Sequence, residues 1–425
     1  MNKIFNEIIN YISPLGIVLI IVGSFISEDH IAVLNIGFLL LIVCAIAYKL
    51  IGINLDINTY KYTIICFASI ALIFFISALL HSYSFTNSFG ALKHKALWFI
   101  IPFLFITLPY YKSLFNLKVS LWVYVITVFI ITTIAFYHYA RDGIFNNYLN
   151  YPWSNYFHVS TIPFRISHHT LSIANNISFT FLIYMLLNKY YLNNWEKIII
   201  ICIVIFNVFY IHLIGARVGH ISFYILIICF VIYLLSDKDK KYFKIVTASL
   251  VLLLLLCTLS YCYINGFRSR INQTIVELKV ILTTHQITNN GNISLRIISI
   301  KNSIPVLKEY ILKGTSFEKY ETTMEYYKIQ NKISDIDWAY PPNQFIVYSI
   351  IIGMPLTVLF FGCLLITAIY RFKDNILVTL GTYLPIILYL NTEAPLETNM
   401  PFRMIIVSIS IACACKKYEL LKLAD

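Results

Sequence analysis

The sequence has little charge for its length, and little of that charge is negative. Only 12% of its 425 residues are charged, with 20 Asp and Glu against 32 Lys and Arg. Soluble domains contain roughly 25% charged residues. Since 59% of the residues are hydrophobic, this small number of charged side chains cannot cover the surface of a soluble fold. The composition therefore excludes most soluble enzymes, disordered chains and DNA-binding proteins, and it indicates a polytopic membrane protein.

The sequence also lacks cysteine in its longest polar segment. All nine cysteines fall inside apolar runs, which argues against a disulfide-stapled outer domain. We interpret Cys413 and Cys415 as lipid-facing small residues, because His and Cys do not have the spacing of a metal site. A cleavable signal peptide is not evident. The first apolar run is followed directly by a second one, so we expect it to be a retained helix.

Apolar runs long enough to cross a bilayer recur along nearly the whole chain. A membrane-spanning helix needs about 20 apolar residues. The sequence therefore predicts an all-α polytopic membrane protein of about twelve transmembrane helices. The predicted spans lie near residues 11–26, 31–51, 60–80, 96–109, 118–140, 170–188, 196–214, 217–235, 243–264, 343–370, 374–391 and 402–415.

The lysines and arginines are concentrated in alternate connections between these runs. When the amino terminus is placed in the cytoplasm, every short inner connection contains at least two cations, whereas the short outer connections are leaner. This is the pattern of the positive-inside rule. It predicts that both termini are cytoplasmic. It also accounts for the net charge of +12 without a nucleic-acid partner.

The only long polar stretch, residues 265–342, follows the ninth apolar run. We expect it to form a helical periplasmic cap over the membrane domain. The chain is thus divided into spans one to nine at 1–264, the outer loop at 265–342, and spans ten to twelve with a cytoplasmic tail at 343–425. Within the loop, the stretch 294–312 has the period of a helix. Its predicted apolar face consists of Ile297, Ile300, Ile304, Leu307 and Ile311.

Four arginines lie at or near the predicted outer surface, namely Arg165, Arg217, Arg296 and Arg403. A guanidinium this close to hydrocarbon is costly unless it is paired or faces a cavity. Four of them on one face suggest a shared anion, and the planar fork of arginine suits phosphate. The alternative is that each side chain snorkels or pairs with a nearby carboxylate. The case for an anion is strongest for Arg217, which lies in a tight hairpin among small residues.

Two histidines and a pair of glutamates also lie at this surface. His168 and His169 follow Arg165 by three and four positions, so one of them shares a helical face with it. Imidazole is suited to act as a base near neutral pH, although an interfacial histidine is also explained as a satisfied polar group. Glu393 and Glu397 are four residues apart, just before the last span.

Three segments resemble the O-antigen ligase and O-antigen polymerase superfamily. Residues 213–220, Leu-Ile-Gly-Ala-Arg-Val-Gly-His, are similar to the small-residue and arginine motif between the seventh and eighth spans. Residues 296–353 resemble the family's arginine helix, glycine turn, Asn-Gln pair and later glycine. Residues 392–397, Thr-Glu-Ala-Pro-Leu-Glu, are similar to an acidic segment before the last span. Residues 165–168 also resemble the segment that precedes the sixth span.

The sequence departs from the family pattern at Pro342, where the family has a histidine before Asn-Gln. In ligases that histidine is thought to assist the acceptor hydroxyl. Its replacement leaves three alternatives: a polymerase, an inactive relative, or a substitute base. The candidates for a substitute catalytic base are His168, His169 and Glu393.

The resemblance implies a metal-independent glycosyltransferase of the bacterial inner membrane that needs no cofactor. Its donor is expected to be an undecaprenyl-diphosphate-linked glycan at the periplasmic face, and its acceptor another glycan or lipid A-core. A ligase and a polymerase differ only in that acceptor. The diphosphate is expected to be bound by Arg217 and Arg296, supported by Arg165 and Arg403, because fixed guanidiniums stabilise a leaving diphosphate. The side chains expected to orient a sugar or phosphate are Asn343 and Gln344.

Two other classes of protein stay open. A transporter or flippase of lipid-linked glycan predicts polar or charged residues near the midplane of several helices. In this sequence the charges gather at the ends of the spans instead. A lipid-phosphate-sugar glycosyltransferase with a divalent metal would use Glu28 and Asp29 as its acidic site.

Overall fold

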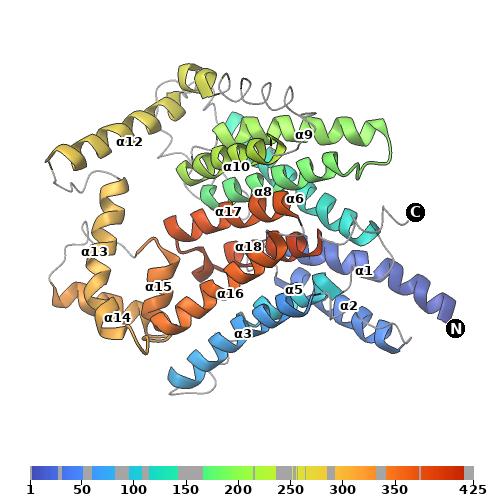
Figure 1. The fold of residues 1–425 in the computed structure, drawn as a ribbon, viewed down its shortest axis with the longest axis horizontal. Coiled ribbons are helices and arrows are strands. Elements are labelled where there is room, and N and C mark those ends of the chain that lie inside the picture. Colours follow the sequence, from blue (N-terminus) through green and yellow to red (C-terminus); the bar gives the residue numbers. More distant parts are fainter. Residues whose placement is uncertain are drawn as a thin grey trace.

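The computed structural model is helical throughout its regular elements (Figure 1). It describes residues 2–26, 31–50, 60–81, 95–107, 114–141, 166–213, 216–235, 251, 255, 257–263, 265–284, 292–331, 341–372 and 375–415. Within these residues, 5 helices are long and apolar enough to cross a membrane, and further shorter apolar helices accompany them. The all-α class is thereby confirmed, and the helices agree with a multi-pass membrane protein.

Most of the predicted spans coincide with one helix each. These helices are α1 (Asn2–Ser24), α2 (Ile31–Leu50), α3 (Lys61–His81), α5 (Leu97–Thr107), α6 (Leu114–Arg141), α8 (His168–Leu187), α9 (Asn194–Leu213), α10 (Arg217–Leu235), α17 (Ile376–Thr392) and α18 (Asn399–Ala414). Most of the predicted span at 243–264 lies outside the described residues.

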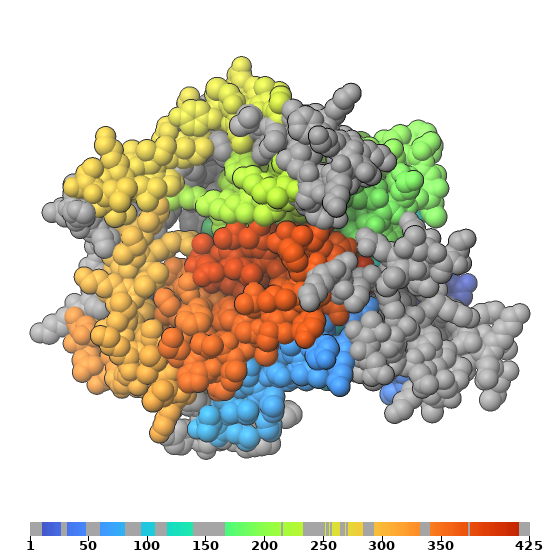
Figure 2. All heavy atoms as spheres, viewed as in Figure 1, coloured from blue at the N-terminus to red at the C-terminus, as the bar shows by residue number. Residues whose placement is uncertain are grey.

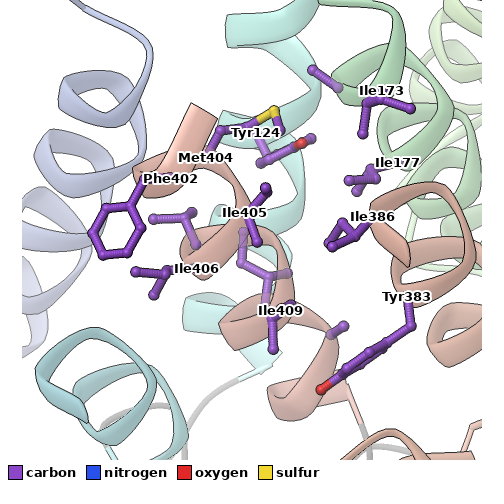
Figure 3. Close-up of a cluster of buried hydrophobic side chains, with 14 of the residues drawn as sticks. Tyr124, Ile173, Ile177, Tyr383, Ile386, Phe402, Met404, Ile405, Ile406 and Ile409 are labelled. Atoms are coloured by element: carbon purple, nitrogen blue, oxygen red, sulfur yellow. The ribbon is translucent and has the colours of Figure 1, made fainter. Parts of the chain in front are cut away.

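The helix α18 lies at the centre of the bundle. All of its residues from Pro401 onward are buried, and Figure 3 shows its isoleucines facing side chains from α6, α8 and α17. Cys413 and Cys415 are both 0% exposed. The interpretation of these two cysteines as lipid-facing was therefore wrong. A helix surrounded by other helices on every side has no face left for lipid.

The helix α8 is the second inner helix, and glycines of two neighbours let them approach it closely. A Cβ atom on Gly219 of α10 would lie 1.6 Å from Ser172 Oγ, and one on Gly381 of α17 would lie 2.1 Å from Thr180 Cγ2. Such close approach through small residues is typical of helix packing in membranes. Gly219, one of the small residues near Arg217, thus allows close contact between α10 and α8.

The predicted tenth span is divided into two helices, α15 (Gln344–Ile351) and α16 (Met354–Phe372). At the break Gly353 has a φ of +83°, which only glycine adopts without strain. The turn at 311–316 docks there through backbone hydrogen bonds, from Thr315 N to Ile350 O at 2.8 Å and from Met354 N to Ile311 O at 2.7 Å. The run 343–370 is therefore not one continuous helix, because the backbone at its break is hydrogen-bonded to the turn at 311–316.

The described residues of 265–342, which we call the outer segment after its predicted position, form α12 (Asn265–Thr284), α13 (Asn292–Tyr310) and α14 (Tyr320–Gln330). They gather at the left end in Figure 1, whereas α1 begins at the right end. Figure 2 shows α13 and α14 beside the orange and red helices α15 to α17. The expected helical content of this segment is thus confirmed for the residues that the structure describes.

The buried face of α13 differs from the predicted apolar face. Ile304 is 42% exposed, whereas Ser294, Ser299 and Ser303 are almost fully buried. Ser299 and Ser303 donate their hydroxyl groups to carbonyl groups of their own helix, as in the bond from Ser303 Oγ to Ser299 O at 2.6 Å. A serine face is compact and internally satisfied, so it permits close packing that hydrophobic periodicity does not reveal.

Candidate functional site

Glu393 lies at the end of α17 and forms an ion pair with an arginine of the outer segment. Arg296 of α13 donates from Nη2 to Glu393 Oε1 at 2.6 Å, and from Nη1 to the carbonyl of Thr392. Both side chains are about two-thirds buried, with 35% and 29% exposure. Two charge-assisted bonds from one guanidinium fix the orientation of the acidic segment relative to α13.

His169 contacts the same carboxylate from the first turn of α8. Its Nε2 lies 3.5 Å from Glu393 Oε1, and the ring of His168 lies 3.9 Å from its ring, centroid to centroid. A hydroxyl pair holds the start of α8 against α17, with Thr170 Oγ1 2.8 Å from Tyr389 Oη. Helices α8, α13 and α17 therefore meet at Glu393.

Two opposing effects act on the pKa of the Glu393 carboxyl group. Burial raises its pKa, and the adjacent Arg296 guanidinium lowers it, with burial the larger effect. The net pKa is higher than that of an ordinary glutamate. A carboxylate with a raised pKa beside an imidazole is a better proton acceptor than an exposed one.

Arg217 is the first residue of α10 and faces a glutamate of the outer segment. Its Nη2 lies 3.8 Å from Glu277 Oε1 on α12. Glu277 Oε2 also accepts from Ile293 N, at the start of α13, at 3.0 Å. One carboxylate therefore joins α10, α12 and α13.

The two arginines are close enough for their positive charges to repel each other. Each has a carboxylate beside it, but the two contacts are unequal, at 2.6 Å for Arg296 and 3.8 Å for Arg217. Arg217 Nε and Nη2 are buried and make no hydrogen bond within the described residues. The arrangement is therefore suited to an anion with two negative charges, which can bridge guanidiniums that repel each other.

Asn343 and Gln344 hold the acidic segment from the start of α15. Asn343 caps the helix by accepting from Ile346 N at 3.1 Å and donates to the carbonyl of Asn391 at 3.2 Å. Gln344 accepts from Leu396 N at 2.8 Å and donates to Glu397 Oε1 at 3.2 Å. Position 342, where the family has its histidine, is therefore adjacent to the segment that carries Glu393. The expected contact of these amides with substrate stays a prediction.

Of the remaining predicted residues, the structure describes only Arg403. Arg403 is 1% exposed within α18, inside the helix bundle. Arg165, Glu28 and Asp29 lie outside the described residues. Among the residues that the structure describes, no group of three or more His, Cys, Asp or Glu is placed to hold a metal ion.

Sequence reasoning missed two residues that the structure brings to this end of the molecule. Glu277 lies in a helix without a motif, and no pattern in the sequence marks it. Lys95 lies directly before the apolar run at 96–109 and is 8% exposed. Two lysines, Lys93 and Lys95, at the outer end of a predicted span run against the positive-inside rule, and this signal was available in the sequence.

Residues 200–361 match the model of the family described as O-antigen ligase. No curated protein matches the chain. The matched segment contains Arg217, Glu277, Arg296 and the Asn343–Gln344 pair, whereas His169 and Glu393 lie outside it. The glycine turn and the break at Gly353 are also within it. Over residues 200–361 the match confirms the resemblance to the O-antigen ligase and polymerase superfamily.

Proposed function

We propose that the protein transfers a glycan from a polyprenyl diphosphate, of the undecaprenyl class, to an acceptor sugar hydroxyl, in the manner of an O-antigen ligase. The observation that carries this proposal is the meeting of Arg296 and His169 on Glu393, with Arg217 close to Arg296. A diphosphate-binding pair and a base–carboxylate pair are the two elements that this reaction needs.

The arginines are assigned to the leaving group. The acceptor oxygen attacks the anomeric carbon, the bond from that carbon to the diphosphate oxygen breaks, and the electron pair leaves with the diphosphate. Negative charge grows on the diphosphate during this step. The diphosphate takes the place of Glu277 and Glu393 as the partner of Arg217 and Arg296, and the two guanidiniums stabilise its charge. No metal or cofactor is needed for that stabilisation.

His169 is assigned as the base that takes the proton of the acceptor hydroxyl. Glu393 orients the imidazole through Nε2 and stabilises the imidazolium that forms. Binding of the diphosphate to Arg296 removes a cation that lowers the pKa of Glu393. Donor binding then makes the carboxylate a stronger proton acceptor, which links the two halves of the site. This pair takes the role of the family histidine that Pro342 replaces.

The proposal places this site at the periplasmic face of the bacterial inner membrane. It includes about twelve spans, cytoplasmic termini, a helical cap at 265–342 and membrane domains at 1–264 and 343–425. Support comes from the grouping of α12 to α14 at the end of the molecule opposite the start of α1 (Figure 1). The acidic segment and the starts of α8 and α10 contact this group or each other.

The same residues serve a polymerase, because only the acceptor differs. The acceptor of a ligase is lipid A-core, and that of a polymerase is a second lipid-linked repeat. A flippase has less support. The buried asparagines of α8 and α9 donate to neighbouring helices, as in the bond from Asn207 Nδ2 to Ser178 Oγ at 3.1 Å. Such bonds between helices stabilise packing in membranes.

The test is a deletion strain whose lipopolysaccharide and lipid-linked glycans are compared with those of the parent. Long glycan retained on the lipid carrier supports a ligase. Single repeats on lipid A-core support a polymerase, and a normal ladder with another surface polymer missing supports a capsule-type polymerase. Unchanged lipid-linked glycans and unchanged surface polymers would refute the proposed transfer.

A further inference from the structure

Lys95 places a buried ammonium group against the acidic segment. It precedes α5, and its Nζ donates to the carbonyl of Leu396 at 2.9 Å. The same nitrogen lies 3.4 Å from Tyr348 Oη and 3.9 Å from Glu397 Oε1. A buried ionisable residue of this kind marks a functional site when its partners are identified.

Four aromatic rings surround this ammonium group. The Nζ atom lies 4.9 Å from the ring centroid of Phe317, 5.0 Å from that of Phe402, 5.6 Å from that of Tyr348 and 5.7 Å from that of Phe74. The rings come from the turn after α13, from α18, from α15 and from α3. Cation–π contacts offset the cost of burying the charge and hold it in one place.

Both backbone polar groups of Leu396 are hydrogen-bonded to side chains. Leu396 O accepts from Lys95, and Leu396 N donates to Gln344 Oε1 at 2.8 Å. Leu396 is the middle residue of the 3-10 turn η4 (Pro395–Glu397), which begins two residues after Glu393. The position of η4 therefore determines where the Glu393 backbone leaves α17 and how its carboxylate meets Arg296 and His169.

An uncharged side chain of similar length would fill the aromatic cage without a desolvation cost. Buried charges are often replaceable by apolar groups with no loss of stability. What the ammonium adds is a directional bond to Leu396 O and a charge beside Glu397. Neither contact involves a group that reacts in the proposed transfer, so the contribution of Lys95 is geometric.

We propose that Lys95 is a positioning residue for the transfer reaction. By fixing η4 together with Gln344, it holds Glu393 against Arg296 and His169. This inference rests on the proposed function, because it takes Glu393 as part of the reacting site. Misplacement of a reacting group by about 1 Å costs on the order of 100-fold in rate.

The experiment compares Lys95→Met with Lys95→Arg in membranes of the deletion strain, with lipid-linked glycan extracted from that strain as donor. We expect Lys95→Met to lower kcat on the order of 100-fold. The KM for the donor should change by less than about twofold, because Arg217 and Arg296 are intact. Lys95→Arg should recover part of the lost kcat, since it keeps the charge and a donor.

Two further variants separate positioning from folding and from simple charge balance. Lys118→Met removes a lysine–glutamate pair of similar exposure, Lys118 with Glu196 at 3.0 Å, at the other end of the spans, and should leave kcat unchanged. The charge-balanced double variant Lys95→Met/Glu397→Gln leaves no unpaired carboxylate from this pair. It should remain as slow as Lys95→Met, because the bond to Leu396 O is still missing.

If the parent protein is active, a wild-type kcat in Lys95→Met would overturn the positioning role. Full recovery of kcat in the double variant would overturn it as well. A larger effect on KM than on kcat would also overturn it. Absence of transfer by the parent protein itself would instead refute the proposed function, so the two failures are distinguishable.

Discussion

Arg296 of α13 and Glu393 at the end of α17 are joined at 2.6 Å, across 97 residues of sequence. The contact brings the outer segment onto the membrane helices at the point where His169 also meets the carboxylate. Because Arg296 donates to a backbone carbonyl as well, it both fixes the acidic segment and presents a cation there.

Arg296→Ala is expected to abolish transfer while the protein stays folded and inserted. Loss of one fixed donor to a developing anion costs about 100- to 1,000-fold in kcat. Arg296→Lys should recover little, because an ammonium group does not reproduce the planar fork. The measurement is the rate of glycan transfer in complemented membranes. Arg268→Ala, an exposed arginine of α12, is the matched control, and activity that survives Arg296→Ala contradicts the assignment.

Glu277→Gln is expected to tighten the binding of a competing anion. The substitution keeps an acceptor for Ile293 N but removes the charge that faces Arg217 at 3.8 Å. A partly exposed ion pair contributes about 0.2–1 kcal/mol, so the inhibition constant of inorganic pyrophosphate should fall by up to about fivefold. Arg217→Ala should remove the inhibition in either background. An unchanged or weaker inhibition in Glu277→Gln would show that the glutamate does not compete for this site.

His169 and His168 provide an internal comparison. His169 Nε2 lies 3.5 Å from Glu393 Oε1, whereas the ring of His168 contacts the ring of His169. Replacement of a general base lowers the rate by about 100- to 10,000-fold, so we expect His169→Gln to be nearly inactive. His168→Gln should retain most of the activity. Transfer rates for the two variants, measured at equal protein levels, decide the assignment, and equal losses would exclude a specific role for His169.

Glu393→Gln is expected to remove activity and to increase thermal stability at neutral and higher pH. The folded-state pKa of Glu393 is raised, with burial as the larger cause. A raised carboxyl pKa means that ionisation weakens the folded state, so the stability of the parent protein falls as pH rises through that pKa. Melting temperatures of both proteins across a pH series test the sign. The gap should widen in favour of Glu393→Gln as pH rises, and a gap that narrows contradicts it.

Gly314→Ala is expected to destabilise the docking of the outer segment. Gly314 has a φ of +78°, and an added Cβ would lie 2.3 Å from Ile351 O. Backbone strain of this kind costs on the order of 1–3 kcal/mol. Gly362→Ala in α16 is the control, because its Cβ would meet nothing within 4 Å. Equal melting temperatures for the two variants would indicate that the turn at 311–316 contributes nothing to stability.

Helix positions followed well from the sequence because each long apolar run has few ways to satisfy its backbone in a membrane other than as a helix. Arg217 was singled out because it lies between two apolar runs with almost no loop, and Arg296 because it opens a helix-periodic stretch that resembles the family's arginine helix. The break at Gly353 was missed, since the pairing that stabilises it comes from Ile311 and Thr315, about 40 residues earlier. The serine face of α13 was missed because hydrophobic periodicity does not score compact polar packing. Lys95 acts through contacts with residues more than 250 positions away, and only the fold brings them together.

The outer helix α13 is anchored at both of its ends, by Arg296 near its start and by the turn at 311–316 on the broken membrane helix. A helix held at two points cannot swing open like a hinged lid without breaking one set of bonds. In the proposed transfer, donor and acceptor would therefore reach Glu393 from the side of the bilayer, through small shifts of the membrane helices rather than through lifting of the outer segment.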